Sequence, residues 1–165
     1  MKGYYNKTEL TAQTKVDGWI YTGDLAEIDE NGFVYIWGRL SDKVKLEDGK
    51  EVYLFDVANK IKEHDFIDDA IVLKKQLDNK GINVVAHIVW DKNVKETDKL
   101  SYLKELKDSI KQFEPGINLC AFAVHDVMLP YSPTTLKKDK NKMVEQKEGF
   151  IQVVDGEIKK VSFIR

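Results

Sequence analysis

The chain has 165 residues, a length that fits one compact domain or one domain with a smaller additional piece. Its hydrophobic content of 42% is enough for a packed core. The net charge of -2 argues against wholesale disorder and against a nucleic-acid-binding surface that depends on overall charge. The single cysteine, Cys120, excludes an intrachain disulfide framework and fits a reducing compartment.

Neither the first residues nor the most apolar segment indicates export or membrane insertion. Met1-Lys2 is followed by Gly-Tyr-Tyr-Asn rather than by an apolar stretch of signal-peptide type. The longest nearly apolar run, residues 82–90, is far shorter than the ~20 residues that a membrane-spanning helix needs. We therefore expect a soluble, cytoplasmic protein without a transmembrane segment.

Residues 18–39, GWIYTGDLAEIDENGFVYIWGR, have the pattern of a β-hairpin. Its turn falls at 29–32, where Asn and Gly accept positive φ angles. The strand 33–38 is apolar in both of its alternating series, so we expect both of its faces to be covered. A hairpin needs neither the Thr-Gly-Asp sequence at 22–24, near its beginning, nor the Gly-Arg sequence at 38–39, at its end. Both are therefore candidates for a ligand site.

Strands and helices alternate along the rest of the chain. The patterns predict, in order, a strand pair around the turn 47–50, a helix over 54–64, strands over 70–73 and 84–90, a helix that Thr97 caps and Pro115-Gly116 ends, a strand over 119–127, and a terminal hairpin with its turn at Asp155-Gly156. This order indicates an α+β fold, in which helices pack on one face of a small mixed sheet.

Several motifs resemble those of the adenylate-forming ligases, the family of acyl-CoA synthetases, luciferases and peptide-synthetase adenylation domains. They are, in chain order, MKGYYN at the first residues, DGWIYTGDL at 17–25, DENGFVYIWGR at 29–39, KLEDGKEVY at 45–53, and a lysine-rich loop near 130–140. The chain is most similar to the acyl-CoA synthetase branch, and the similarity covers nearly all of it except the C-terminal end.

The resemblance implies that this chain corresponds to the C-terminal part of a longer enzyme. The family's phosphate loop and adenine-contacting segment lie upstream, in a large N-terminal domain. Residues 1–38 would be the β-rich end of that domain and 39–42 a hinge. Residues 43–140 would then form an α+β lid domain, and 141–165 a terminal extension with a β-hairpin.

The resemblance also places a nucleotide beside the two ends of the first hairpin. A loop carboxylate can accept hydrogen bonds from both ribose hydroxyls, and the family's Asp at the position of Asp24 does so for ATP and AMP. Thr22 and Gly23 would set the turn for close backbone approach. The Arg39 guanidinium can fork onto ribose or phosphate oxygens. From the residues alone, an ordinary turn and a surface arginine are the alternatives.

A rotation of the lid between two half-reactions is a further implication, with its pivot at Ser41, where the family usually has Asp or Lys. Hinge residues need only absorb a large φ/ψ change, and small residues do this well. In one pose the lid completes the adenylation site. In the other, the hairpin from Lys45 to Gly49 faces the thiol-acceptor channel, where Gly49 would allow close approach. The alternative for Gly49 is a simple turn glycine.

The catalytic lysine of the family follows a Thr-Pro-Thr-x-Lys sequence in its long-chain variant. That lysine is positively charged at neutral pH and stabilises the charge that develops as pyrophosphate leaves. Here 132–134 matches the variant, but one residue is inserted before Lys137 and the family's usual glycine is absent. Lys137 is the first candidate, Lys138 the second, and Lys140 a competitor. A solvated lysine-rich linker is the alternative.

No metal ligand is expected among the histidines. His64, His87 and His125 fall on separate predicted elements, without metal-ligand spacing and without a cysteine partner. Mg²⁺ would accompany ATP in the longer enzyme, held largely by the phosphates. Cys120 is expected in the core rather than as a nucleophile. Acidic residues interleave with the lysine runs, which argues against nucleic acid as a partner.

The leading hypothesis is therefore the C-terminal portion of an AMP-forming acid–thiol ligase. It would activate a carboxylic acid, with a fatty acid as the expected class, and pass the acyl group to a thiol, with CoA as the expected acceptor. The isolated chain is predicted to be inactive, because most of the nucleotide and acyl pocket lies upstream. The alternatives are a non-catalytic interaction module derived from this domain and a free-standing nucleotide-binding domain.

Overall fold

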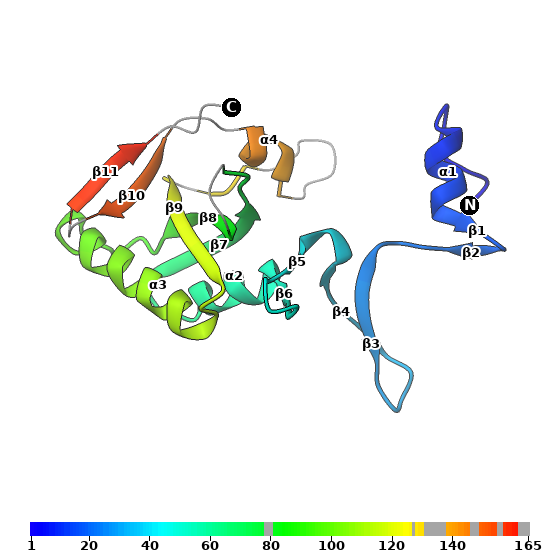
Figure 1. Ribbon diagram of the computed structural model, residues 1–165, viewed down its shortest axis with the longest axis horizontal. Helices are drawn as coiled ribbons and strands as arrows, with labels where there is room; N and C mark the ends of the chain where they lie inside the picture. The colour runs from blue at the N-terminus through cyan, green and yellow to red at the C-terminus, as the bar shows by residue number, and fades with distance from the viewer. Residues whose placement is uncertain (78–80, 127, 131–137, 146–148, 155–156, 162–165) are drawn as a thin grey trace. The chain divides into compact units, whose positions relative to one another are not determined.

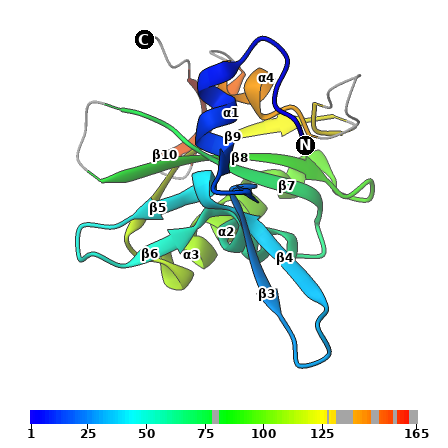
Figure 2. The ribbon, with the colours of Figure 1, turned by 90° about the vertical axis from the view of Figure 1, so that its right-hand side faces the viewer.

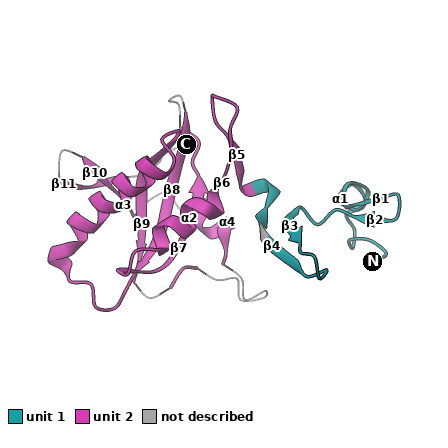
Figure 3. Ribbon diagram, turned by 90° about the horizontal axis from the view of Figure 1, so that it is seen from below, with its two compact units in different colours: residues 1–41 teal, residues 42–165 magenta. Residues whose placement is uncertain are grey.

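The computed structural model describes residues 1–77, 81–126, 128–130, 138–145, 149–154 and 157–161 (Figure 1). The chain divides into two compact units, Met1–Ser41 and Asp42–Arg165 (Figure 3). The boundary between the units falls inside a short 3-10 helix, Leu40–Asp42.

The first unit is built from short elements around one hairpin. These elements are α1 (Thr8–Thr14), β1 (Lys15–Val16), β2 (Trp19–Ile20), β3 (Asp24–Ile28) and β4 (Val34–Arg39). The β3–β4 turn has the expected chemistry. The Asp29 carboxylate accepts hydrogen bonds from the N–H groups of Asn31 and Phe33, each at 2.9 Å, and Gly32 has a φ of 83°. The hydrogen bond from Phe33 is the main reason that the pKa of Asp29 is lowered.

The expectation that both faces of the strand 33–38 are covered is wrong for this unit. β4 pairs with β3, and no described element of the unit packs over it. Phe33 is 64% exposed, Tyr35 52% and Ile36 67%. Among the residues of 1–41 whose side chains the structure describes, none is buried. The apolar pattern therefore identified a strand, but the unit itself supplies no layer to cover it.

The second unit is an α+β layer structure around a mixed sheet. Its elements are β5 (Lys43–Lys45), β6 (Glu51–Tyr53), α2 (Leu54–Lys62), β7 (Ile67–Lys74), β8 (Ile82–Trp90), a 3-10 helix (Glu96–Asp98), α3 (Lys99–Phe113), β9 (Ile117–His125), α4 (Lys140–Glu145), β10 (Phe150–Val154) and β11 (Glu157–Val161). The strand order is β11-β10-β9-β8-β7. β8 and β9 are parallel because α3 crosses between them, whereas the other neighbouring pairs are antiparallel.

One face of this sheet is covered by α2 and α3 (Figures 1 and 2). The helices form there because their apolar residues recur at helical spacing, so each buries a continuous stripe. The buried residues are Leu54, Val57, Ala58 and Ile61 on α2, and Leu103, Leu106 and Ile110 on α3. The predicted helix over 54–64 is thus confirmed to within two residues at its end.

The opposite face is also covered, contrary to the prediction that helices pack on one face alone. Leu73 and Val89 form a buried cluster with Leu129 and with Met143 of α4. Successive strand residues point to opposite faces, and β8 is buried at seven consecutive positions, so both faces of its sheet are interior. The lysine-rich composition of 138–147 concealed Met143, a buried apolar residue through which α4 packs on the sheet.

The terminal hairpin extends the same sheet. β10 and β11 pair from Phe150 with Val161 to Val154 with Glu157, and the predicted turn at 155–156 lies outside the described residues. Phe150 is buried with Val85, Ala121 and Ala123. Burial of the Phe150 side chain therefore holds the hairpin against the neighbouring strands β8 and β9.

Thr97 does not cap α3. Asp98 is the N-cap residue, and no side chain makes a capping hydrogen bond there; the Thr97 hydroxyl instead donates to the Asp98 carboxylate at 2.9 Å.

In the part of the chain that the structure describes, no helix has the length and apolar character needed to cross a membrane.

Candidate functional site

Asp24 and Arg39 form an ion pair across the ends of the first hairpin. The two residues are directly opposite in the antiparallel β3–β4 register, with Arg39 Nε 3.0 Å from Asp24 Oδ1. A backbone hydrogen bond from Leu40 N–H to Gly23 C=O, at 2.8 Å, closes the pair of strands beyond them. The hairpin therefore brings together two side chains that are 15 residues apart in sequence.

The Thr-Gly-Asp turn supports this pair through its backbone. Arg39 Nη1 donates to the Thr22 C=O at 2.7 Å, and the Asp24 N–H donates to the Thr22 hydroxyl at 3.2 Å. Gly23 has a φ of 73°, a conformation that glycine adopts at little cost. A Cβ at this position would lie 3.9 Å from Arg39 Nη1, an ordinary contact. The glycine is thus required by its backbone angle rather than by lack of space.

The pair is accessible and can exchange partners. The Arg39 side chain is 52% exposed and the Asp24 side chain 28%. An ion pair with this exposure contributes little net stability, because solvent screens it, so a ligand can compete for both groups. The carboxylate can accept bonds from vicinal hydroxyls, and the guanidinium can donate to phosphate or hydroxyl oxygens. These are the groups that a nucleoside phosphate offers.

The Lys45-to-Gly49 hairpin lies in the second unit, between β5 and β6. Lys45 pairs with Glu51 in the register and its side chain is exposed. Gly49 has a φ of 88°, and no atom lies within 4 Å of the position that a Cβ would take. The backbone at the tip is therefore open to close approach, and a turn glycine is sufficient to explain the residue.

The structure describes the lysine-rich segment from residue 138 to residue 145. Lys137 lies outside the described residues. Lys138 Nζ lies 2.6 Å from Asp69 Oδ1, with side-chain exposures of 29% and 25%, and Lys140 forms an ion pair with Asp42. Neither carboxylate partner could be predicted from a local pattern, since Asp69 and Asp42 are 69 and 98 residues away. Only the fold brings them to these lysines.

Two of the three histidines, expected on separate elements, are brought into contact. His87 Nδ1 lies 3.1 Å from His125 Nε2, because β8 and β9 are parallel neighbours. Burial lowers the pKa of His87 to about 4, and burial also lowers the pKa of His125. Within the described ranges, no group of three or more His, Cys, Asp or Glu side chains could hold a metal ion.

Cys120 belongs to the sheet rather than to a reactive site. Its thiol donates to the Val84 carbonyl at 3.2 Å, and burial raises its pKa. A raised pKa leaves less thiolate at neutral pH, and the thiolate is the reactive form.

Comparisons with known proteins identify relatives over most of the chain, although no family model matches it. A 2-succinylbenzoate–CoA ligase from Bacillus cytotoxicus is 26% identical over 146 residues, which are 88% of this chain and 29% of the relative. A long-chain-fatty-acid–CoA ligase from Bacillus subtilis is 38% identical over 101 residues, 61% of this chain and 18% of the relative.

A solved structure shows the same fold at similar identity. The o-succinylbenzoate coenzyme A synthetase from Bacillus subtilis, in complex with AMP, is 26% identical over 90% of this chain, with a TM-score of 0.61. The same enzyme in complex with an acyl-adenylate gives a TM-score of 0.62. This chain covers 29% of either structure. The chain is therefore homologous to the adenylate-forming acyl-CoA ligases, and it spans less than a third of the length of these relatives.

Proposed function

We propose that this chain is the C-terminal segment of an AMP-forming acid–thiol ligase. The complete enzyme joins a carboxylic acid, with a fatty acid as the proposed class, to ATP, which yields an acyl-adenylate and pyrophosphate. It then transfers the acyl group to a thiol, with CoA as the proposed acceptor, and releases AMP. The relatives named as CoA ligases, and the one bound to AMP and to an acyl-adenylate, support this proposal.

The observation that carries the proposal is the Asp24–Arg39 pair. Two side chains of complementary charge, both accessible, are held 3.0 Å apart by strand register and by the Thr22 turn. Asp24 would hold the ribose hydroxyls of ATP or AMP, and Arg39 would turn from Asp24 to the ribose or phosphate oxygens. The donor set present thus fits a nucleotide. Mg²⁺ would be held by the phosphates and not by a described side chain of this chain.

The domain assignment belongs to the same proposal. Residues 1–38 would be the end of a large nucleotide-binding domain, and the absence of a buried described side chain in 1–41 favours a segment that is covered by other parts of a longer protein. Residues 39–42 would be the hinge, 43–140 the lid, and 141–165 the extension. We place the enzyme in the cytoplasm. In the adenylating pose, Lys137 or Lys138 would face the α-phosphate, and in the thiol-transfer pose the hairpin from Lys45 to Gly49 would face the acceptor.

Acid-dependent ATP–pyrophosphate exchange tests the proposal. The isolated chain should show none, because the upstream phosphate loop is missing. A longer polypeptide that includes this segment should show exchange, and Asp24→Asn should reduce it at least tenfold by weakening ribose binding. The matched control is Asp17→Asn, an exposed turn residue of the same unit, which should leave exchange unchanged. Exchange by the isolated chain, or full activity of Asp24→Asn, would contradict the proposal.

A non-catalytic interaction module is the second candidate, because Lys138 and Lys140 are both paired with carboxylates rather than free. Lys137→Ala and Lys138→Ala in the longer polypeptide separate the two. If neither variant slows adenylation or thioester formation, the lysine segment is not catalytic and the module is favoured. Loss of adenylation in one variant alone would identify that lysine as the catalytic one.

A further inference from the structure

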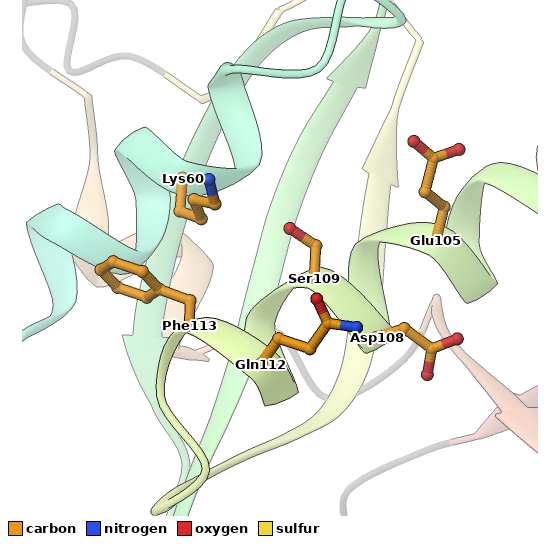
Figure 4. Close-up of a pocket in the computed structure, with 6 residues that line it drawn as sticks. All are labelled: Lys60, Glu105, Asp108, Ser109, Gln112 and Phe113. Carbon is orange, nitrogen blue, oxygen red and sulfur yellow. The ribbon is translucent and has the colours of Figure 1, made fainter.

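A second cluster of polar side chains lies in an open pocket of about 530 Å³ in the second unit. Figure 4 shows the six residues that line it, most of them from α3: Lys60, Glu105, Asp108, Ser109, Gln112 and Phe113. The pocket combines a hydroxyl, carboxylates, an amide and an ammonium group with one apolar wall. Such a convergence of polar groups in a concave site calls for a chemical explanation.

His64 contacts two of the residues that line this pocket, Glu105 and Ser109, and is itself well packed. It follows the end of α2, and its C=O accepts a hydrogen bond from the Ile67 N–H at 2.9 Å. Its ring lies 5.1 Å from the ring of Phe66, which in turn stacks on Tyr102 at 4.0 Å. The His64 side chain is only 17% exposed. The imidazole is therefore packed in one orientation beside α3.

Both ring nitrogens of His64 have partners on α3. Nδ1 lies 3.3 Å from Glu105 Oε1, and Nε2 lies 3.2 Å from the Ser109 Oγ. Glu105 and Ser109 are four residues apart on one helix, so they share a face and both reach the same ring. The order is carboxylate, imidazole, hydroxyl. With Nδ1 protonated toward Glu105, the free lone pair of Nε2 faces the serine proton, which is the arrangement that activates a serine nucleophile.

We infer that Ser109 is a nucleophile for activated acyl esters, with His64 as its general base and Glu105 as the residue that positions His64. Ser109 Oγ attacks the ester carbonyl and forms the new C–O bond, while its proton moves to His64 Nε2. The ester C–O bond breaks, and the leaving oxygen takes that proton from His64. Water then attacks the acyl-serine by the reverse path, which releases the carboxylic acid and restores the Ser109 hydroxyl.

The position of Ser109 sets the rate that can be expected. Because it lies inside α3, its own N–H is bonded within the helix and cannot bind the oxyanion. The donors that line the pocket are the Lys60 ammonium, which also bonds Glu63 at 2.6 Å, and the Gln112 amide. The loss of a preorganised backbone donor costs about 10²–10³ in rate. The expected activity is therefore acylation of Ser109 by reactive esters, followed by slow release.

The inference does not rest on the proposed ligase function, because it needs neither a nucleotide nor an upstream domain. The full chain is treated with an alkyl fluorophosphonate, in which Ser109 Oγ displaces fluoride from phosphorus, and with p-nitrophenyl acetate. Labelled peptides are identified by mass spectrometry. Ser109 should be labelled at least tenfold faster than Ser101, a serine of the same helix whose hydroxyl donates to the Asp98 carbonyl at 2.7 Å and has no histidine partner.

Variants test each role. Ser109→Ala should abolish the label and the release of p-nitrophenolate above background, whereas Ser101→Ala should change neither. His64→Gln should slow labelling about 100-fold, in the range for general-base catalysis. Glu105→Gln, at a residue whose side chain is 54% exposed, should fold normally and slow labelling about tenfold.

A pH profile separates catalysis from a purely structural contact between the two helices. In the native chain the labelling rate should show an inflection with pH, as expected for a reaction that uses a general base. This inflection should vanish in His64→Gln. If Ser109 is labelled no faster than Ser101, or if His64→Gln and Glu105→Gln label at the native rate while circular dichroism shows them folded, the cluster only joins α2 to α3 and the inference is wrong.

Discussion

The imidazoles of His87 and His125 face each other across the parallel strands β8 and β9, with Nδ1 and Nε2 3.1 Å apart and ring centroids 5.4 Å apart. The rings of Phe150 and His87 are T-shaped to each other, with centroids 6.1 Å apart, and Lys75 Nζ lies 5.3 Å from the centroid of the Phe150 ring. His87 is 1% exposed, so this contact is part of the interior beneath the terminal hairpin. Protonation of His87 would place a positive charge in this interior, where no bulk water can solvate it.

This contact predicts a loss of stability in acid. Burial, with the positive charges of His125 and Lys75, lowers the pKa of His87 from its usual value of 6.5 to about 4. The unfolded chain therefore binds the proton more readily, so stability is fully present above pH 6.5 and is lost as the pH falls toward 4. Between pH 7 and 4.5 this group alone should remove about 2 kcal/mol.

Urea unfolding at the two pH values measures this effect. His87→Gln removes the titrating group, so its free energy of unfolding should fall less between pH 7 and 4.5 than that of the native chain. The difference between the two falls isolates His87 from the carboxylates that also titrate in this range. Equal falls would show that His87 is protonated as readily in the folded chain as in the unfolded one.

We expect Leu106→Ala to lower the free energy of unfolding of the second unit strongly. Leu106 is 0% exposed and lies between α3 and the sheet, so truncation removes buried methyl groups and leaves a cavity. The expected loss in free energy of unfolding is about 2–5 kcal/mol. Leu10→Ala, at a residue of α1 that is 40% exposed, is the matched control and should cost less than about 0.5 kcal/mol. Chemical denaturation of both variants gives the comparison.

The backbone angle of Gly49 predicts a strain effect without a clash. Gly49 has a φ of 88° and open space around the Cβ position. Gly49→Ala should therefore destabilise the chain by about 1 kcal/mol through the left-handed conformation alone. Gly49→Asn should cost less, because asparagine tolerates this region better. If thermal unfolding shows the same loss of stability for both variants, the left-handed backbone conformation is not the cause of that loss.

The Lys138–Asp69 pair predicts a measurable coupling energy. The two atoms lie 2.6 Å apart and both side chains are about one-quarter exposed, so the pair is less screened than a fully exposed one. A double-mutant cycle with Lys138→Met and Asp69→Asn should give about 1 kcal/mol at low salt and less at high salt. The pair Lys60–Glu63, within one turn of chain, serves as a control near 0.3 kcal/mol. A coupling of zero would show that Lys138 is already free to act elsewhere.

Local patterns predicted the regular elements well, because hydrophobic periodicity is a local property. The spacing of Leu54, Val57 and Ile61 fixed α2, and the long apolar run at 82–90 fixed a central strand that the structure buries at seven consecutive positions. Thr97 failed as a helix cap because Asp98 occupies that position. Capping depends on single backbone angles, which a residue pattern does not specify.

By itself, the sequence determined the first hairpin, the helices α2 and α3 and the long strands of the second unit. It also determined where the turns at 29–32 and 47–50 lie and which side chains are candidates for nucleotide contact. The tertiary structure decided which of these meet: Arg39 with Asp24, Lys138 with Asp69, and His64 with Glu105 and Ser109. Such pairs depend on strand register and helix packing, which are set by contacts between residues far apart in the chain. A local pattern identifies the type of an element through its period, whereas the residues that the element contacts are determined only by the packed fold.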